Sequence, residues 1–275
     1  MKKILFIALW MLLRHPLWAT DLFRVSGGRA AAMGRTSVCE RSVWSLQNNP
    51  AGMAFLNSWH LGLYYENQWL LRETAFKAGA AIKSVPNVGC FGVSVQQFGG
   101  GQYSESRLGL AYARGFGPYL QLGLSADYLL LHWGEGYPNR GAFSISLGMQ
   151  SQLTERLRAG ACIFHPIPVK TATLNGDQLP VVMRFGLAFQ CVDDFVVQVD
   201  VEKDRLRSGV RLSGGFEYLL LKQFSLRAGI QHNPDILSFG AAYSMRHLKV
   251  DVAAQMHQML GASVQIGINY EFERQ

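Results

Sequence analysis

The chain has 275 residues, of which 49% are apolar and only 16% are charged, and its formal net charge is +7. Soluble domains carry about 25% charged residues, and a bundle of membrane-spanning helices would need a mean hydropathy well above the observed +0.07. The basic residues are dispersed along the chain and form no stripe, so the net charge does not indicate nucleic-acid binding.

Residues 1–19 have the pattern of a secretory signal peptide. Two lysines precede a ten-residue apolar core at 4–13, which is too short to cross a bilayer, and cleavage is expected after Ala19. The mature chain is therefore expected to be exported. No later apolar run is long enough to anchor it as a helix.

Residues 20–57 form a segment without alternation. Small residues dominate 27–34, and a helix-compatible stretch follows at 37–47. We expect a helix there that stops before Pro50, because proline forces the residue before it into extended geometry. The position of this segment depends on the fold of the rest of the chain.

From residue 58 onward, apolar and polar residues alternate. In 261–272, for example, Val264, Ile266 and Ile268 share one face, while Gln265 and Asn269 share the other. Strict alternation over eight or so residues predicts a β-strand. Division at the turn residues gives strands near 58–67, 72–83, 88–98, 105–115, 118–131, 140–152, 155–164, 180–191, 194–203, 208–220, 222–231, 236–245, 247–257 and 261–272.

The strand lengths predict an all-β, 14-stranded antiparallel transmembrane β-barrel over residues 58–275. A tilted strand needs about 9–11 residues to cross a membrane, and a sheet in lipid must close so that no edge stays unpaired. A soluble β-sandwich would have shorter strands and polar faces richer in charge. In the barrel, the lumen can hold residues 20–57 as a plug, and the long connections 131–140 and 164–180 both fall on the outer side.

Several N-terminal motifs carry a family resemblance. The stretch from Gly27 to Gly34, the pair Trp44-Ser45, and the run Asn49-Pro50-Ala51-Gly52-Met53-Ala54 resemble the N-terminal signature of the FadL superfamily, most closely its PorV/PorQ branch. The run from Phe224 to Phe272 is similar to the last four strands of that family. The resemblance implies a 14-stranded barrel of the bacterial outer membrane whose N-terminal segment folds inside as a hatch.

Two functions follow from the resemblance and remain open. FadL-type members take up hydrophobic molecules and open by hatch movement, which implies a channel for small hydrophobic compounds. PorV/PorQ members act with the type IX secretion system, which implies a non-transporting barrel that binds secretion-system proteins. The short outer loops favour the second function, and the complete hatch favours the first.

The candidate functional residues lie in the plug and on the luminal face. The predicted hatch or gate consists of Gly27, Gly28, Arg29, Gly34, Asn49, Pro50, Ala51 and Gly52. A buried Arg29 needs an acidic partner, so we expect it to tie the plug to the wall. The alternation places a charge network in the lumen, formed by Lys77, Arg107, Asp127, Arg158, Arg184, Asp200, Glu202, Arg211, Glu217, Arg227, Lys249 and Asp251.

The sequence offers little for catalysis. The seven histidines have no zinc-binding spacing, no serine sits in a GxSxG motif, and no cysteine pairs with a histidine at ligand spacing. We therefore expect neither an enzyme nor a metal or other cofactor. The expected partners are outer-membrane lipid and either a small hydrophobic ligand or secretion-system proteins. Residues Trp133, Tyr137 and 167–169 of the outer loops either contact such a partner or form part of an interfacial aromatic belt.

Overall fold

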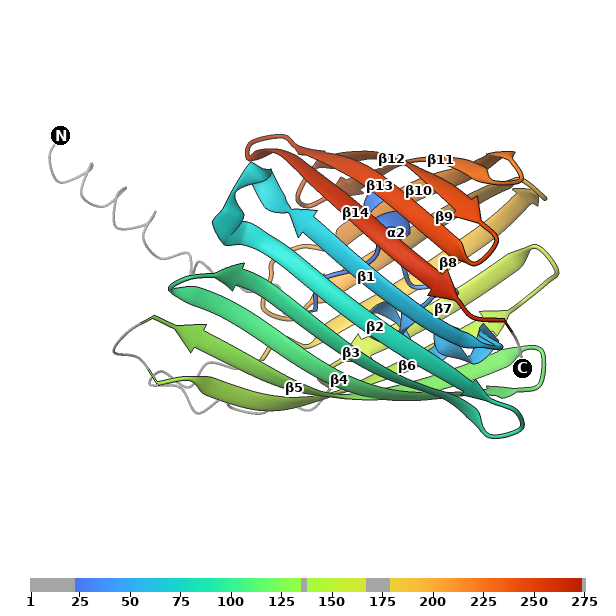
Figure 1. Ribbon diagram of the computed structural model, residues 1–275, viewed down its shortest axis with the longest axis horizontal. Helices are drawn as coiled ribbons and strands as arrows, with labels where there is room; N and C mark the ends of the chain where they lie inside the picture. Colours follow the sequence, from blue (N-terminus) through green and yellow to red (C-terminus); the bar gives the residue numbers. More distant parts are fainter. Residues whose placement is uncertain (1–22, 135–137, 167–178, 274–275) are drawn as a thin grey trace, which may run out of the picture.

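The computed structural model describes residues 23–134, 138–166 and 179–273. Its fourteen strands form one closed antiparallel barrel in which each strand pairs with its neighbours in the chain and β1 pairs with β14 (Figure 1). The strands are Trp59–Asn67 (β1), Ala75–Val85 (β2), Gly89–Gly100 (β3), Tyr103–Phe116 (β4), Leu120–Trp133 (β5), Arg140–Gln152 (β6), Leu157–Phe164 (β7), Val182–Val192 (β8), Phe195–Asp204 (β9), Arg211–Leu221 (β10), Phe224–His232 (β11), Ile236–Met245 (β12), Leu248–His257 (β13) and Gly261–Glu271 (β14). The predicted fold class and strand count are confirmed.

The closure between the first and last strands removes the sheet edge. Leu63 on β1 is opposite Ile268 on β14, and Phe272 N donates a hydrogen bond to the carbonyl oxygen of Trp59 at 2.9 Å. A closed sheet leaves no strand edge that lipid would have to cover, as a membrane barrel requires. Among the described residues, no helix is both long and apolar enough to span a bilayer.

The two faces of the barrel differ sharply. Large apolar side chains point outward and remain exposed, including Leu63, Phe143 and Ile230 at 65%, 74% and 63%. The inward positions carry mainly small, amide and charged side chains, which are buried. An apolar outer face around a polar interior is the arrangement of bacterial outer-membrane barrels. The barrel therefore has the architecture of an outer-membrane protein.

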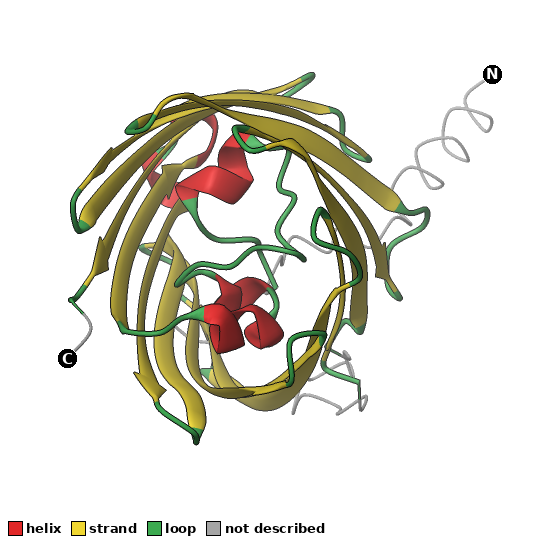
Figure 2. Ribbon diagram, turned by 90° about the vertical axis from the view of Figure 1, so that its right-hand side faces the viewer, coloured by secondary structure: helices red, strands yellow, loops and turns green. Residues whose placement is uncertain are grey.

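The plug fills the lumen. It contains the helices Gly28–Ala32 (α2) and Ser45–Asn48 (α3) and the 3-10 helix Pro50–Phe55 (η1), all enclosed by the ring of strands (Figure 2). The described chain begins at the outer end, where Phe23 packs on Phe164 with ring centroids 5.2 Å apart. It leaves at the opposite end, which is predicted from the sequence to be periplasmic, where β1 begins. The N-terminal segment therefore crosses the lumen along its length.

The predicted helix over 37–47 is wrong. The α-helix α3 covers only Ser45–Asn48, so it overlaps that stretch at its last three residues. The stretch from Ser37 to Val38 is instead held by the wall, because both backbone N–H groups donate to the Asp200 carboxylate of β9, at 2.6 and 2.9 Å. A charged acceptor binds an N–H more strongly than a helix carbonyl does, so the wall determines the local conformation.

Candidate functional site

Glycines of the wall accommodate the plug. On nine strands, an inward-facing glycine lies so close to the plug that a Cβ added to it would clash. At Gly215 this atom would lie 2.5 Å from the Met33 oxygen, and at Gly160 it would lie 2.9 Å from the Val38 oxygen. The glycines are Gly62, Gly92, Gly123, Gly148, Gly160, Gly186, Gly215, Gly229 and Gly240. At these nine positions the wall carries no side chain, which lets the plug lie directly against the strands.

The Asn49-Pro50-Ala51-Gly52 turn anchors the plug near β6. The Asn49 amide donates to the carbonyls of Val38, at 2.8 Å, and Met149, at 3.2 Å, while its oxygen accepts from the Ala51 N–H at 3.3 Å. Gly52 is buried, and a Cβ there would meet the Glu40 carbonyl. The turn thus joins two parts of the plug to each other and to the wall. Its role as a gate stays a prediction.

Arg29 is tied to the wall by Glu217. The Arg29 Nε donates to the Glu217 carboxylate of β10 at 2.8 Å, and Arg227 of β11 contacts the same carboxylate at 2.7 Å. Arg227 also pairs with Asp251 of β13, which accepts a hydrogen bond from Asn269 of β14 at 2.8 Å. The network therefore links α2 to residues of four strands, β10, β11, β13 and β14. Of the predicted luminal acids, Glu217 is the one that the structure pairs with Arg29.

The other predicted luminal charges form separate groups. Arg107 and Asp127 make a buried ion pair at 2.8 Å. Arg184 and Arg211 share Glu202. The two remaining basic residues of the prediction also lie on luminal positions, Arg158 beside Gly160 of β7 and Lys249 two residues before Asp251 of β13. The ion pairs neutralise charges that would otherwise stay unpaired inside the lumen.

Lys77 corrects the prediction, because it faces outward. On β2 the outward positions are Lys77, Gly79, Ala81 and Lys83, and the buried inward positions are Phe76, Ala78, Ala80 and Ile82. The larger apolar side chains of this strand thus point into the lumen. They do so because the plug offers them an apolar surface, so the usual rule that apolar residues face lipid is reversed here.

The reversed strand belongs to an apolar patch inside the barrel, which sequence analysis missed. Trp44, Leu46 and Met53 of the plug pack with wall residues that include Tyr64 and Ile82. The Trp44 and Tyr64 rings meet edge to face, with centroids 5.8 Å apart. This luminal patch extends over β1–β4. The signal that could have found it is the run 78–82, Ala-Gly-Ala-Ala-Ile, in which neither face of the strand carries a polar side chain.

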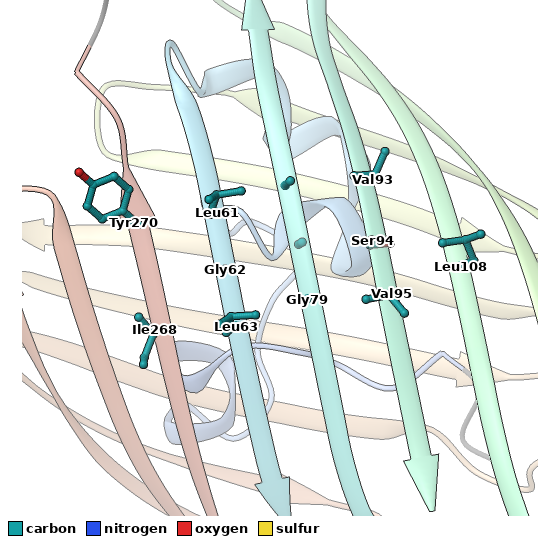
Figure 3. Close-up of a pocket in the computed structure, with 12 residues that line it drawn as sticks. Leu61, Gly62, Leu63, Gly79, Val93, Ser94, Val95, Leu108, Ile268 and Tyr270 are labelled. Atoms are coloured by element: carbon teal, nitrogen blue, oxygen red, sulfur yellow. The ribbon is translucent and has the colours of Figure 1, made fainter.

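An apolar groove lies on the lipid-facing side of the same wall. It has a volume of about 520 Å³ and runs over β1, β2, β3 and β14. Leu61 and Leu63 flank it on one side of Gly79, and Val93 and Val95 flank it on the other (Figure 3). Between the groove and the luminal patch, residues 78–81 read Ala-Gly-Ala-Ala. At β2 the wall therefore separates two apolar surfaces with little more than backbone.

The outer end of the lumen contains a vestibule of about 490 Å³. The connection from β1 to β2, with the 3-10 helices Gln68–Leu70 (η2) and Arg72–Thr74 (η3), forms part of its rim. Trp69 lines it with φ 53°, a value that non-glycine residues rarely adopt. Its backbone N–H donates to Ser263 Oγ at 3.0 Å, which holds the residue in place.

Two further predictions concern the outer loops and cofactors. Trp133 ends β5 at the outer rim, where its ring meets Tyr103 edge to face at 5.1 Å. Tyr137 and residues 167–169 lie outside the described residues. Over the described ranges, no three His, Cys, Asp or Glu side chains are grouped as a metal site would need.

No known protein-family profile matches the chain, and no curated protein matches it in sequence. Solved structures do match it in fold. The chain is similar to the toluene transporter TbuX of Ralstonia pickettii, with 15% identity, 91% of this chain and 100% of that one covered, and a TM-score of 0.69. The toluene transporter TodX of P. putida matches with 13% identity, 90% and 99% coverage and a TM-score of 0.67.

A Pseudomonas aeruginosa FadL homologue gives a TM-score of 0.66 at 13% identity, with 91% of this chain and 99% of that one covered. The chain has the FadL-like barrel fold. At these identities the likeness concerns architecture, and the FadL-like match includes the N-terminal segment before β1. The comparisons do not distinguish a PorV/PorQ branch within FadL-like barrels.

Proposed function

We propose that this FadL-like barrel is a channel for small hydrophobic compounds across the outer membrane, closed in the present structure by its plug. One observation carries the proposal: the luminal apolar patch lies directly behind the lipid-facing groove at β2. An apolar luminal surface does not stabilise a polar solute, whereas contact with it lowers the free energy of a hydrophobic compound. The similar structures named as toluene transporters support the same class of ligand.

The plug must move for passage to occur. It contacts the wall glycines without free space, so residues 27–54 have to shift before a compound can pass the vestibule. A compound that enters from outside would then replace the side chains of Trp44, Leu46 and Met53 on the luminal patch. From there it would leave toward the periplasm or sideways at β2, where only small side chains separate lumen from lipid.

Uptake into liposomes tests this function. The purified barrel is inserted into liposomes, and the entry of a neutral aromatic hydrocarbon is followed beside empty liposomes and beside a variant lacking residues 27–54. Uptake by the wild type that the deletion alters supports a gated channel. No uptake by the wild type, with non-selective leak of a hydrophilic dye only after deletion, rejects transport.

A second candidate function is a non-transporting, partner-binding barrel of a type IX-like secretion system. The observation that favours it is the short outer connections. Those between β9 and β10, between β11 and β12, and between β13 and β14 span only residues 205–210, 233–235 and 258–260. Such short connections build no deep capture groove outside the barrel. Failure of uptake in the liposome experiment, together with specific retention of secretion-system proteins by the intact barrel, would favour this function.

A further inference from the structure

The outer vestibule is amphipathic. Among the described residues that line it, four are arginines (Arg24, Arg35, Arg207 and Arg211) and one is a carboxylate, Glu73. Aromatic rings of Trp69, Phe98 and Tyr103 line it as well. Its volume of about 490 Å³ falls within the range of about 300–1,000 Å³ that small-molecule sites occupy. The vestibule thus combines an excess of positive charge with flat apolar surfaces.

Three of the four arginines already have acidic partners. Arg35 donates to Glu66 at 2.7 Å, Arg207 lies 3.5 Å from Asp204, and Arg211 pairs with Glu202. Each of these contacts neutralises an arginine within the wall. These three arginines therefore shape the vestibule and add to its positive potential, but their donors are largely engaged.

Arg24 differs from them. Its side chain is buried, with 6% exposure, and no described carboxylate lies within ion-pair distance of it. The buried Glu66, which already pairs with Arg35, interacts with Arg24 only through longer-range electrostatics. The Arg24 Nη1 atom has no hydrogen-bond partner within the described part of the chain. The guanidinium lies over the Phe98 ring, 4.4 Å from its centroid, and 5.4 Å from the centroid of Phe76. A buried cation with an unused donor leaves a favourable interaction unmade.

The orientation of Arg24 suits a planar anion. A guanidinium stacked on an aromatic ring keeps its edge free, and that edge matches a carboxylate with two parallel hydrogen bonds. The rings of Trp69 and Tyr103 then offer surface to an aromatic body attached to the carboxylate. A neutral hydrocarbon would contact the same rings but would leave the Arg24 donor unpaired.

We propose that the outer vestibule binds hydrophobic aromatic acids, with the carboxylate on Arg24, stacked on Phe98, and the ring system against Trp69 and Tyr103. The inference deepens the proposed function, since it names the substrate class that the channel receives. It distinguishes this chain from a channel that accepts neutral hydrocarbons only.

The test measures the binding of 2-naphthoate to the full mature barrel in an uncharged detergent by titration calorimetry at neutral pH. The neutral analogue 2-methylnaphthalene, in which a methyl replaces the carboxylate, serves as competitor. Arg24→Met keeps the side-chain stem and removes the charge. Arg24→Lys keeps the charge without the planar edge. Arg246→Met is the matched control, because Arg246 is 85% exposed at the periplasmic end.

We expect Arg24→Met to weaken naphthoate binding by about tenfold to a hundredfold, the worth of one hydrogen bond to a charged group. Arg24→Lys should lie between Arg24→Met and the wild type, and Arg246→Met should bind as the wild type does. The neutral analogue should compete poorly. Heat-dependent gel mobility shows whether each variant is a folded barrel. If Arg24→Met does not fold, the preference of the wild type for naphthoate over methylnaphthalene still tests the proposed anion site.

Equal affinity for the acid and the neutral analogue, or unchanged naphthoate binding by folded Arg24→Met, would overturn the inference. The proposed channel is judged separately by liposome uptake of 2-methylnaphthalene. If the neutral compound enters while naphthoate does not bind, the channel stands and the anion site falls. If naphthoate binds through Arg24 while neither compound enters, the site stands and the channel falls.

Discussion

Replacement of Gly215 by alanine tests whether the wall holds the plug. A Cβ at this position would lie 2.5 Å from the Met33 oxygen and 2.7 Å from both its carbonyl carbon and its Cα. These are backbone atoms, so no side-chain rotation relieves the clash, and the plug has to move by roughly 1 Å. Overpacking of this kind costs about 1–3 kcal/mol. Since 1.4 kcal/mol is a factor of ten, the unseated plug should become about five- to 150-fold more populated.

The neighbouring glycine supplies the control. Gly214 lies on the same strand but faces outward, and a Cβ there meets no atom within 4 Å. In planar bilayers we expect Gly215→Ala to open more often than the wild type, and Gly214→Ala to match the wild type. Barrel melting should change little in either variant. If Gly215→Ala conducts no more than Gly214→Ala, the wall glycines do not hold the plug and the reasoning fails.

Three further substitutions probe the charges of the lumen. Glu217→Gln removes the partner of Arg29 and should speed amide hydrogen exchange over 28–35, because breaking a buried ion pair costs about 3–5 kcal/mol; unchanged exchange would mean that the pair is not a latch. Asp127→Asn should lower the melting temperature for the same reason, since Arg107 then stays buried and unpaired; an unaltered melting curve would contradict this. Burial raises the pKa of the plug carboxyl Glu40 above its ordinary 4.5. Protection of the plug from amide hydrogen exchange should therefore be greatest below pH 4.5 and should decline as the pH rises through the raised pKa of Glu40. In Glu40→Gln this protection should exceed that of the wild type at neutral pH and equal it at low pH.

The strands were predictable because their signal is local. Alternation along 261–272 requires only that one face meets lipid and the other does not, and the structure places β14 at Gly261–Glu271. The helix predicted over 37–47 failed for the opposite reason. Its conformation depends on Asp200, more than 160 residues away in the chain, which captures the N–H groups of Ser37 and Val38.

The candidate site was predictable only where residue composition showed which segments lie close to other backbone. Glycine-rich and Asn-Pro motifs mark a segment that approaches other backbone closely, and residues 27–34 and 49–52 do lie against the wall. Partner choice was not predictable, since alternation makes every inward acid equivalent and only the three-dimensional register selects Glu217 for Arg29. Lys77 was placed on the wrong face because the prediction turned the charged face of every strand toward the lumen, whereas on β2 the apolar face packs on the plug.

The reversal of β2 also bears on how the plug can be released. If the plug moved away without a ligand, Tyr64, Phe76 and Ile82 would face water, and each Å² of apolar surface newly exposed costs about 25 cal/mol. A hydrophobic compound that covers these side chains removes that cost, whereas a polar solute does not. The apolar patch therefore couples plug movement to the arrival of a hydrophobic ligand, because a ligand shifts an equilibrium only by binding one state better than the other.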